Sequence, residues 1–142
     1  MSEPQFRWQV RVYYEDTDAA GVVYYANYLR FFERARTEWL RAQGWGQEVL
    51  ARTHGLGFVV AEANIEYKRP ARLDDLIELE LRVIQSGRAS LSFEQTALRA
   101  GELLARARVK IGCVSMASFA PAAMPAEMIS RMKSLSTPAG TP

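Results

Sequence analysis

Residues 21 to 43 read GVVYYANYLRFFERARTEWLRAQ, and this stretch decides the fold. Its polar side chains recur at helical spacing and form one stripe: Arg30, Glu33, Arg34, Thr37, Glu38 and Arg41. Its apolar side chains form the opposite stripe: Tyr28, Phe31, Phe32, Ala35, Trp39 and Ala42. The pattern predicts one long helix over this range, ended by Gly44. Val22, Tyr25 and Leu29 widen the apolar stripe near the start, so we expect other structure to enclose the first half.

Strand patterns lie on both sides of this helix. Residues Phe6–Tyr14 alternate between apolar and polar side chains, which predicts the first strand, and Glu15–Ala20 is expected to form a loop. Four more strands are expected over Phe58–Lys68, Leu76–Gln85, Ala89–Arg99 and Leu103–Phe119. Short turns separate the last three, which indicates antiparallel hairpins. A short extra helix is predicted over Trp45–Arg52.

The predicted order is therefore strand, long helix and four strands. A long apolar helix followed by an antiparallel sheet must bury itself against that sheet. We expect an α+β fold in which a five-stranded antiparallel sheet wraps around a long central helix. The edges of such a sheet stay open, so we also expect a homodimer, extended edge to edge, or a homotetramer.

Composition limits the class of protein. The 142 residues suit one domain, predicted over 1–121, and a Pro-rich tail is predicted over 122–142, with a short helix around 126–133 and a disordered end from Ser134. The single cysteine, Cys113, is expected to be an inert core residue. No signal peptide or membrane span is visible, so we expect a cytoplasmic protein. Charges of both signs alternate around a net +2, which argues against nucleic acid as a partner.

Two aspartates, Asp16 and Asp18, precede the predicted helix start at Gly21. The first backbone N–H groups of a helix lack partners and carry partial positive charge, and a glycine lets a ligand approach them. Such donors can stabilise a developing oxyanion, while a carboxylate can act as general base or nucleophile. An aspartate in this place is more often only an N-cap, so its position alone does not decide between capping and catalysis. A calcium loop is excluded because Asn27 stands where the bidentate glutamate is needed, and no metal is expected.

The longer motif carries a resemblance. Residues 13–38, YYEDTDAAGVVYYANYLRFFERARTE, together with Phe58-Val59-Val60 and with residues 67–75, YKRPARLDD, resemble the 4-hydroxybenzoyl-CoA thioesterase family of hotdog proteins. Within that family the similarity is greatest to the YbgC-type acyl-CoA thioesterases associated with the Tol-Pal system. The resemblance covers roughly Trp8 to Pro121.

The resemblance implies a hotdog fold and hydrolysis of acyl-CoA, with acyl groups on an acyl carrier protein as an alternative substrate. It implies that Asp18 is the catalytic carboxylate and that the backbone N–H of Tyr25 polarises the thioester carbonyl. Many YbgC-type relatives carry His where this chain has Tyr25; the backbone donor survives that change, but a side-chain acid–base role does not. Coenzyme A is part of the substrate, so no cofactor is expected.

Further site residues are expected around this pair. Substrate contacts are predicted from Gly21, Val22, Tyr24, Asn27 and Tyr28, although Asn27 can equally brace the Asp loop. Contacts to the CoA phosphates are predicted from Lys68, Arg69, Arg72, Arg88 and Ser90, with ordinary surface charge as the competing interpretation. Asp16 is expected to shape the loop, and His54 to be exposed.

Two other functions compete with hydrolysis. A non-catalytic module of the same fold would hold an acyl-CoA or a carrier-bound acyl group without cutting it. A carboxylate beside the predicted oxyanion donors argues against that alternative, because a pure binder has no need of it. A dehydratase of this fold relies on a His or Glu on the central helix, and no His occurs there.

Overall fold

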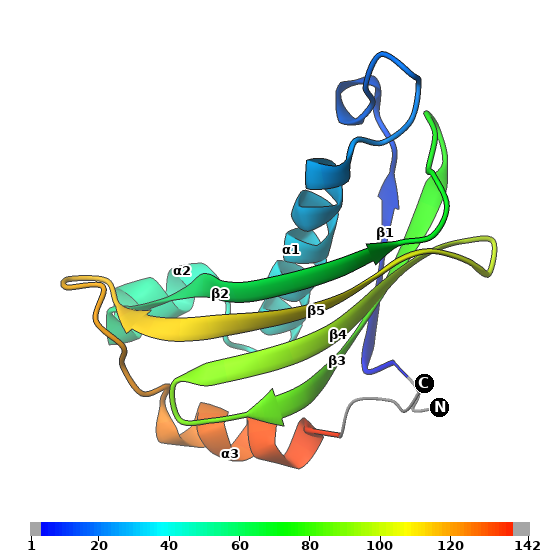
Figure 1. Ribbon diagram of the computed structural model, residues 1–142. Helices are drawn as coiled ribbons and strands as arrows, with labels where there is room; N and C mark the ends of the chain where they lie inside the picture. Colours follow the sequence, from blue (N-terminus) through cyan, green and yellow to red (C-terminus); the bar gives the residue numbers. More distant parts are fainter. Residues whose placement is uncertain (1–3, 138–142) are drawn as a thin grey trace.

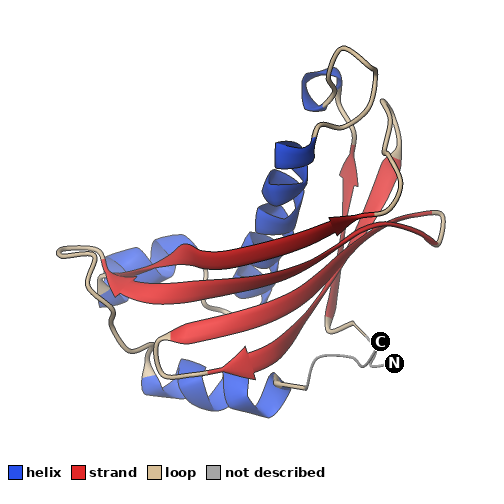
Figure 2. Cartoon of the chain, in the orientation of Figure 1, coloured by secondary structure: helices blue, strands red, loops and turns tan. Residues whose placement is uncertain are grey.

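The computed structural model describes residues 4–137 of the chain. The elements follow the order β1 (Phe6–Arg11), α1 (Tyr25–Ala42), α2 (Gln47–Val49), β2 (Leu56–Tyr67), β3 (Leu76–Ser86), β4 (Ser90–Arg99), β5 (Glu102–Ser115) and α3 (Ala126–Leu135) (Figure 2). A 3-10 turn at Tyr14–Asp16 precedes α1, and a π-helical turn at Leu50–His54 follows α2. The predicted elements are all present, with shifted ends.

The strands form one antiparallel sheet in the order β1-β3-β4-β5-β2. The sheet curls around α1, whose N-terminal end lies near one tip of the molecule (Figure 1). Hairpins join β3 to β4 and β4 to β5, whereas β1 and β2 are the two edges. The expected α+β architecture, a five-stranded antiparallel sheet around a central helix, is confirmed.

The core lies between α1 and the inner face of the sheet. Alternate residues of the central strands are buried there, and the indole of Trp39 meets the ring of Phe93 edge-on at 5.4 Å. Burial of each large side chain contributes roughly 1.5–3 kcal/mol. The expected enclosure of the first helical turns is wrong for a single chain, because Tyr25 is 71% and Leu29 44% exposed. Ala42, expected on the apolar stripe, is exposed as well.

Two strands end several residues earlier than predicted. β1 ends at Arg11 rather than at Tyr14, because Tyr14 is already the first residue of the 3-10 turn. β5 stops at Ser115 rather than Phe119, because the backbone N–H of Phe119 turns back onto the Ser115 carbonyl at 2.7 Å. Within residues 4–137, no helix is both long enough and apolar enough to cross a bilayer.

The helix expected around 126–133 is α3, and it packs into the same core. Met124, Met128 and Met132 are buried, and the Thr137 backbone N–H donates to the Val83 carbonyl at 3.0 Å. Residues 122–137 thus continue the packed structure rather than leave it. The boundary at residue 121 stays a prediction, and residues 138–142 of the predicted disordered end lie outside the described residues.

The core also holds a polar pair that the sequence patterns do not reveal. Arg36 of α1 is buried, and its guanidinium donates to the side-chain oxygen of Gln95 on β4 at 2.9 Å. The amide nitrogen of Gln95 donates in turn to the carbonyl of Phe32 at 2.9 Å. Burial lowers the pKa of Arg36 to about 10. Gln95 therefore ties the middle of α1 to the sheet.

We predict that Gln95→Leu destabilises the fold by about 2–4 kcal/mol, because it leaves a buried guanidinium without its acceptor. Equilibrium urea unfolding measures the loss. The double variant Arg36→Met with Gln95→Leu removes both partners and is expected to recover most of it. Equal stabilities of the single and double variants would contradict this account of the pair.

Candidate active site

Residues 17–23, here named the Asp loop, form a small antiparallel turn. Thr17 pairs with Val23, the Asp18 backbone N–H donates to the Val22 carbonyl at 2.9 Å, and the Gly21 N–H donates to the Asp18 carbonyl at 2.9 Å. Gly21 has a φ of +80°, a region that favours glycine. This turn, and the pairing of Val22 and Val23 that follows, occupy the residues predicted to start the helix.

The helix consequently begins at Tyr25, four residues later than predicted, and Tyr24 is its N-cap residue. Asp18 is therefore not an N-cap. Its Oδ1 instead accepts the Ala20 backbone N–H at 2.9 Å, the contact of an Asx turn. Among residues 4–137 the carboxylate makes no salt bridge, and the residue is exposed. The turn thus presents the carboxylate at the surface, with a backbone N–H as its partner.

The segment between β2 and β3, residues 68–75, supports the Asp loop and is named the connector here. The Val23 N–H donates to the Ala71 carbonyl at 2.8 Å, and Val22 pairs with Arg72. Arg99, at the end of β4, donates to the Pro70 carbonyl at 3.1 Å and to Asp75 at 2.8 Å. The Arg99 guanidinium therefore binds the connector at both Pro70 and Asp75. The Asp loop pairs with this same connector.

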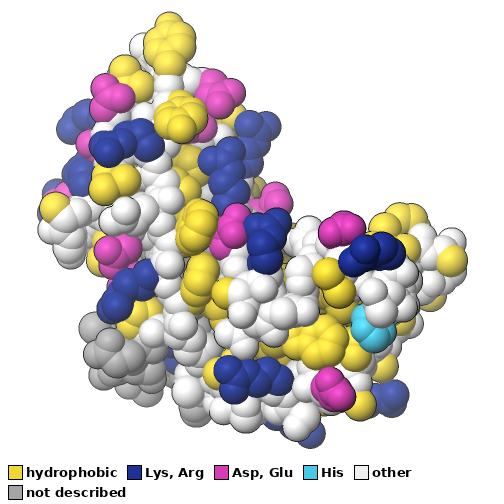
Figure 3. All heavy atoms as spheres, turned by 180° about the vertical axis from the view of Figure 1, so that it is seen from behind, with side chains coloured by type: hydrophobic (Ala, Val, Ile, Leu, Met, Phe, Trp, Pro, Cys, Tyr) yellow, Lys and Arg dark blue, Asp and Glu magenta, His cyan; other side chains and the backbone are white. Residues whose placement is uncertain are grey.

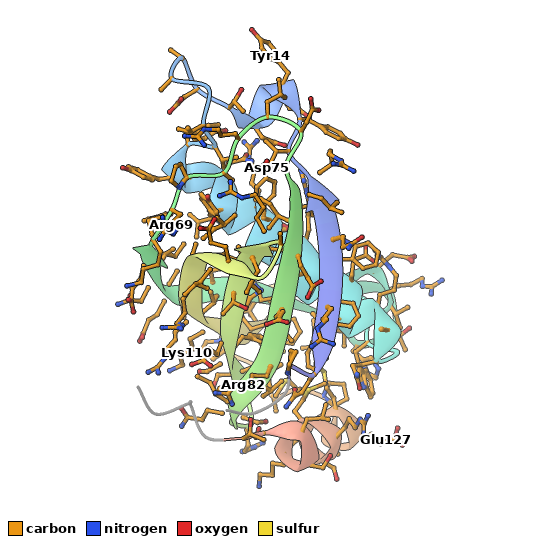
Figure 4. All side chains as sticks on the ribbon, turned by 90° about the vertical axis from the view of Figure 1, so that its right-hand side faces the viewer. Tyr14, Arg69, Asp75, Arg82, Lys110 and Glu127 are labelled. Carbon is orange, nitrogen blue, oxygen red and sulfur yellow. The ribbon has the colours of Figure 1, made fainter. Side chains whose placement is uncertain are left out.

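The carboxylate of Asp75 accepts two hydrogen bonds. Burial raises the pKa of its carboxyl, but hydrogen bonds from the Arg72 backbone N–H and from the Arg99 side chain outweigh burial and hold the pKa below its ordinary value. Figure 4 shows Asp75 at the same end of the molecule as Tyr14. A carboxyl with a depressed folded pKa stabilises the fold above its unfolded pKa of 3.8, and that contribution is lost as the pH falls through the folded value.

We predict that Asp75→Asn lowers the free energy of unfolding at pH 7 by about 1–2 kcal/mol. The difference between variant and wild type should shrink as the pH falls below about 4, where Asp75 takes up a proton. Urea unfolding between pH 7 and pH 3 measures both. Asp74→Asn, at the exposed neighbouring position, is the control, and a pH-independent difference for Asp75→Asn would contradict the assignment.

Asp16 and Asn27 join the 3-10 turn to α1. The buried carboxylate of Asp16 accepts the Tyr13 backbone N–H at 2.8 Å and the side-chain N–H of Asn27 at 2.9 Å. Asp16 thus shapes the loop, as expected from the sequence. Because the amide nitrogen of Asn27 faces Asp16, its contact supports bracing over substrate binding.

The start of α1 presents free donors beside aromatic rings. Within residues 4–137 the backbone N–H groups of Tyr25 and Ala26 have no acceptor, as is general for a first helical turn. Exposed aromatic side chains also gather at this end of the molecule, where hydrophobic and charged groups intermingle at the surface (Figure 3). Tyr28 lies beneath, and its pKa is raised by burial.

The predicted CoA contacts fall into two groups. Lys68, Arg69 and Arg72 belong to the connector beside the Asp loop, where Lys68 pairs with Glu66 and Arg69 with Glu102, both at 3.1 Å. Arg88 and Ser90 lie at the β3–β4 turn, at the opposite end of the 11-residue strand β3. That strand separates the two groups by about 30 Å within one chain.

Other polar features do not join the Asp loop. A hollow of about 620 Å³ lies on the outer face of the sheet, lined in part by Asn64, Ser92, Arg108 and Lys110. Figure 4 shows Lys110 away from Tyr14 and the tip. His54 is exposed, as predicted, and its ring lies beside that of Trp45. Cys113 is buried, and burial raises the pKa of its thiol.

Comparison with known proteins identifies the family. The model of the thioesterase-like superfamily matches residues 12–132, which reaches from the end of β1 into α3. The chain belongs to the thioesterase-like superfamily. The acyl-CoA thioesterase YbgC of Haemophilus influenzae is 46% identical over 128 residues, covering 90% of this chain and 94% of that protein. The acyl-CoA thioester hydrolase YbgC of an Escherichia coli strain is 43% identical, covering 94% and 99%.

Solved structures from other organisms share the fold. A probable thioesterase from Bartonella henselae superposes with a TM-score of 0.80 at 38% identity, covering 84% of this chain and 98% of that one. A hypothetical protein from Thermus thermophilus gives 0.85 at 26% identity, covering 94% and 99%. The expected hotdog fold, family and enzyme class, a thioester hydrolase, are thereby confirmed.

Proposed function

We propose that this chain hydrolyses acyl-CoA thioesters at the Asp loop. The observation that carries the proposal is the placement of Asp18, held in a hydrogen-bonded turn that continues through Val22 and Tyr24 to the free N–H groups of α1. A fixed carboxylate and fixed donors are what acyl transfer to water requires. The YbgC relatives, named for the same reaction, support this substrate class.

In the proposed reaction the Tyr25 backbone N–H donates to the thioester carbonyl oxygen and stabilises the charge that develops there. Asp18 acts in one of two ways. As general base it takes a proton from water while the water oxygen bonds to the carbonyl carbon. As nucleophile it forms an anhydride that water then opens. In both cases the carbon–sulfur bond breaks, the thiolate of CoA leaves, and a carboxylic acid remains.

We predict that Asp18→Asn lowers kcat by about 10²–10⁴-fold, the range general acid–base catalysis contributes, without unfolding the protein. Release of free thiol from a panel of acyl-CoA esters of different chain length measures the loss. Glu127→Gln, on α3, is a control in which an exposed carboxylate is removed elsewhere. Undiminished turnover by a folded Asp18→Ala protein would exclude this mechanism.

The same panel tests the alternative of a non-catalytic binding module. Tight binding of acyl-CoA without any free thiol would favour the module over the hydrolase. Label in the Asp18 carboxylate after a single turnover in oxygen-18 water would identify Asp18 as the nucleophile, because general-base catalysis places the label only in the product. Tyr25 in place of the more common His leaves the backbone donor intact, so we expect this difference to affect rate or acyl preference.

We further propose that the functional unit is a dimer paired through β2. β2 is an edge strand of 12 residues, and Val59 and Val60 are 44% and 54% exposed. A long apolar edge is normally covered, because its free N–H and C=O groups invite another strand. The other edge, β1, has only six residues.

Such a dimer also accounts for the two separate groups of predicted CoA contacts, one on the connector and one at the β3–β4 turn. Leu56 pairs with Ser115 and Ser90 with Gly112, so the β3–β4 turn lies at the Leu56 end of β2. Antiparallel pairing of two β2 strands sets the Leu56 end of one beside the Tyr67 end of the other. Arg88 of the partner subunit would then lie at the end of the sheet that carries this chain's Asp loop.

We predict that Val60→Lys, which places a charge on the β2 edge, yields a monomer with little thioesterase activity. Light scattering after size exclusion measures the mass, and circular dichroism confirms the fold. Trp8→Lys, on the β1 edge, is the matched control and should keep the oligomer. A Val60→Lys monomer with full activity would show that one chain suffices.

Three expectations stay predictions: a cytoplasmic location, acyl carrier protein as an alternative donor, and association with the Tol-Pal system. Whether the chain forms a dimer or a tetramer is also untested. Each concerns partners or surroundings rather than the Asp loop.

A further inference from the structure

Tyr67, the last residue of β2, reaches across to the start of α1. Its hydroxyl donates to the backbone carbonyl oxygen of Tyr25 at 3.1 Å. The rings of these two residues lie 4.8 Å apart, and the Tyr67 ring meets that of Tyr28 edge-on at 5.5 Å. One side chain therefore joins the end of β2 to the first peptide groups of the helix.

The hydrogen bond is additional to those a helix requires. A carbonyl at the start of a helix accepts the N–H of the residue four positions later, which for Tyr25 is Leu29. The groups without partners at this end are N–H donors, not carbonyls. The Tyr67 hydroxyl thus uses the second lone pair of an oxygen already satisfied. Its consequence lies in the orientation of that peptide group.

The carbonyl of Tyr25 and the N–H of Ala26 belong to the same planar peptide unit. A contact that fixes the oxygen also fixes the direction in which the Ala26 N–H points. Donation to the carbonyl polarises the amide as well, and hydrogen bonds linked in this way strengthen one another by about 10–30%. Within residues 4–137 the Ala26 N–H has no acceptor, so a ligand can use the improved donor.

We propose that Tyr67 is a positioning residue, whose hydroxyl orients and polarises the Ala26 N–H so that it joins the Tyr25 N–H in stabilising the thioester oxygen. This inference rests on the proposed function and adds a second donor to it. Burial raises the pKa of Tyr67, so the hydroxyl keeps its proton at neutral pH and remains a donor.

Tyr67→Phe tests the proposal, because it removes the hydroxyl and keeps both ring contacts. We expect kcat to fall about 5- to 20-fold, less than the roughly 10²–10³-fold loss when an oxyanion donor is removed outright. KM and the melting temperature should change little. Tyr14→Phe, whose side chain is 82% exposed, removes a hydroxyl nearby and should leave kcat unchanged.

A binding measurement separates positioning from a merely structural role. Two non-hydrolysable acyl-CoA analogues are compared, both with CH₂ in place of sulfur, one with a ketone at the carbonyl position and one with CH₂ there. Wild type should prefer the ketone, and Tyr67→Phe should lose most of that preference. Because the ratio is taken within one variant, partial unfolding does not alter it.

The outcomes distinguish the two proposals when Asp18→Asn is assayed in parallel. Inactive Asp18→Asn together with unchanged kcat and unchanged ketone preference in Tyr67→Phe would overturn the role of Tyr67 alone. Fully active Asp18→Asn would overturn the proposed function itself. Equal loss of affinity for both analogues in Tyr67→Phe would also overturn positioning, since it would show a general defect in binding.

Discussion

The hydrogen bond from the Val23 N–H to the Ala71 carbonyl is the contact on which the arrangement of the site depends. It joins the Asp loop to the connector, two segments almost fifty residues apart in the chain. Arg99 holds the connector from the other side by binding Pro70 and Asp75. Without this pairing, the turn that presents Asp18 would be attached only through its own chain ends. The position of the Asp loop is thus set by strand pairing rather than by the helix that follows.

The sequence predicted the elements well where local periodicity was strong. α1 is amphipathic over most of its length, and the alternation in β3 and β4 shows directly in their buried residues. The helix start was missed because helix-like spacing continues through Val22, while the Asx turn at Asp18 and the pairing with the connector compete with it. The first of these competing contacts is local. The second is long-range and leaves no periodic signal.

The site was predicted only in part, for related reasons. Asp18 and the donors of Tyr25 were found from motif and helix chemistry, and their roles remain proposals. In the core, the pair of Arg36 and Gln95 was missed because an arginine within a charged helical run is typical of a surface residue. Tyr67 begins the motif of residues 67–75, but its contact with Tyr25 depends on where β2 ends relative to α1, which one sequence does not show. Residues that act through tertiary contacts carry no signature of their own in one sequence.

The contact between Gln5 and the end of α3 has a practical consequence. The side chain of Gln5 donates to the Leu135 carbonyl at 2.6 Å and accepts the Val83 N–H at 3.0 Å, so the first strand and the last helix meet at one place. That place lies away from the tip that carries the Asp loop (Figure 1). A segment that leads from Gln5 or Leu135 to a tag, a surface tether or a fused second enzyme therefore starts away from the Asp loop of the same chain. The same closeness makes the chain a suitable starting point for circular permutation.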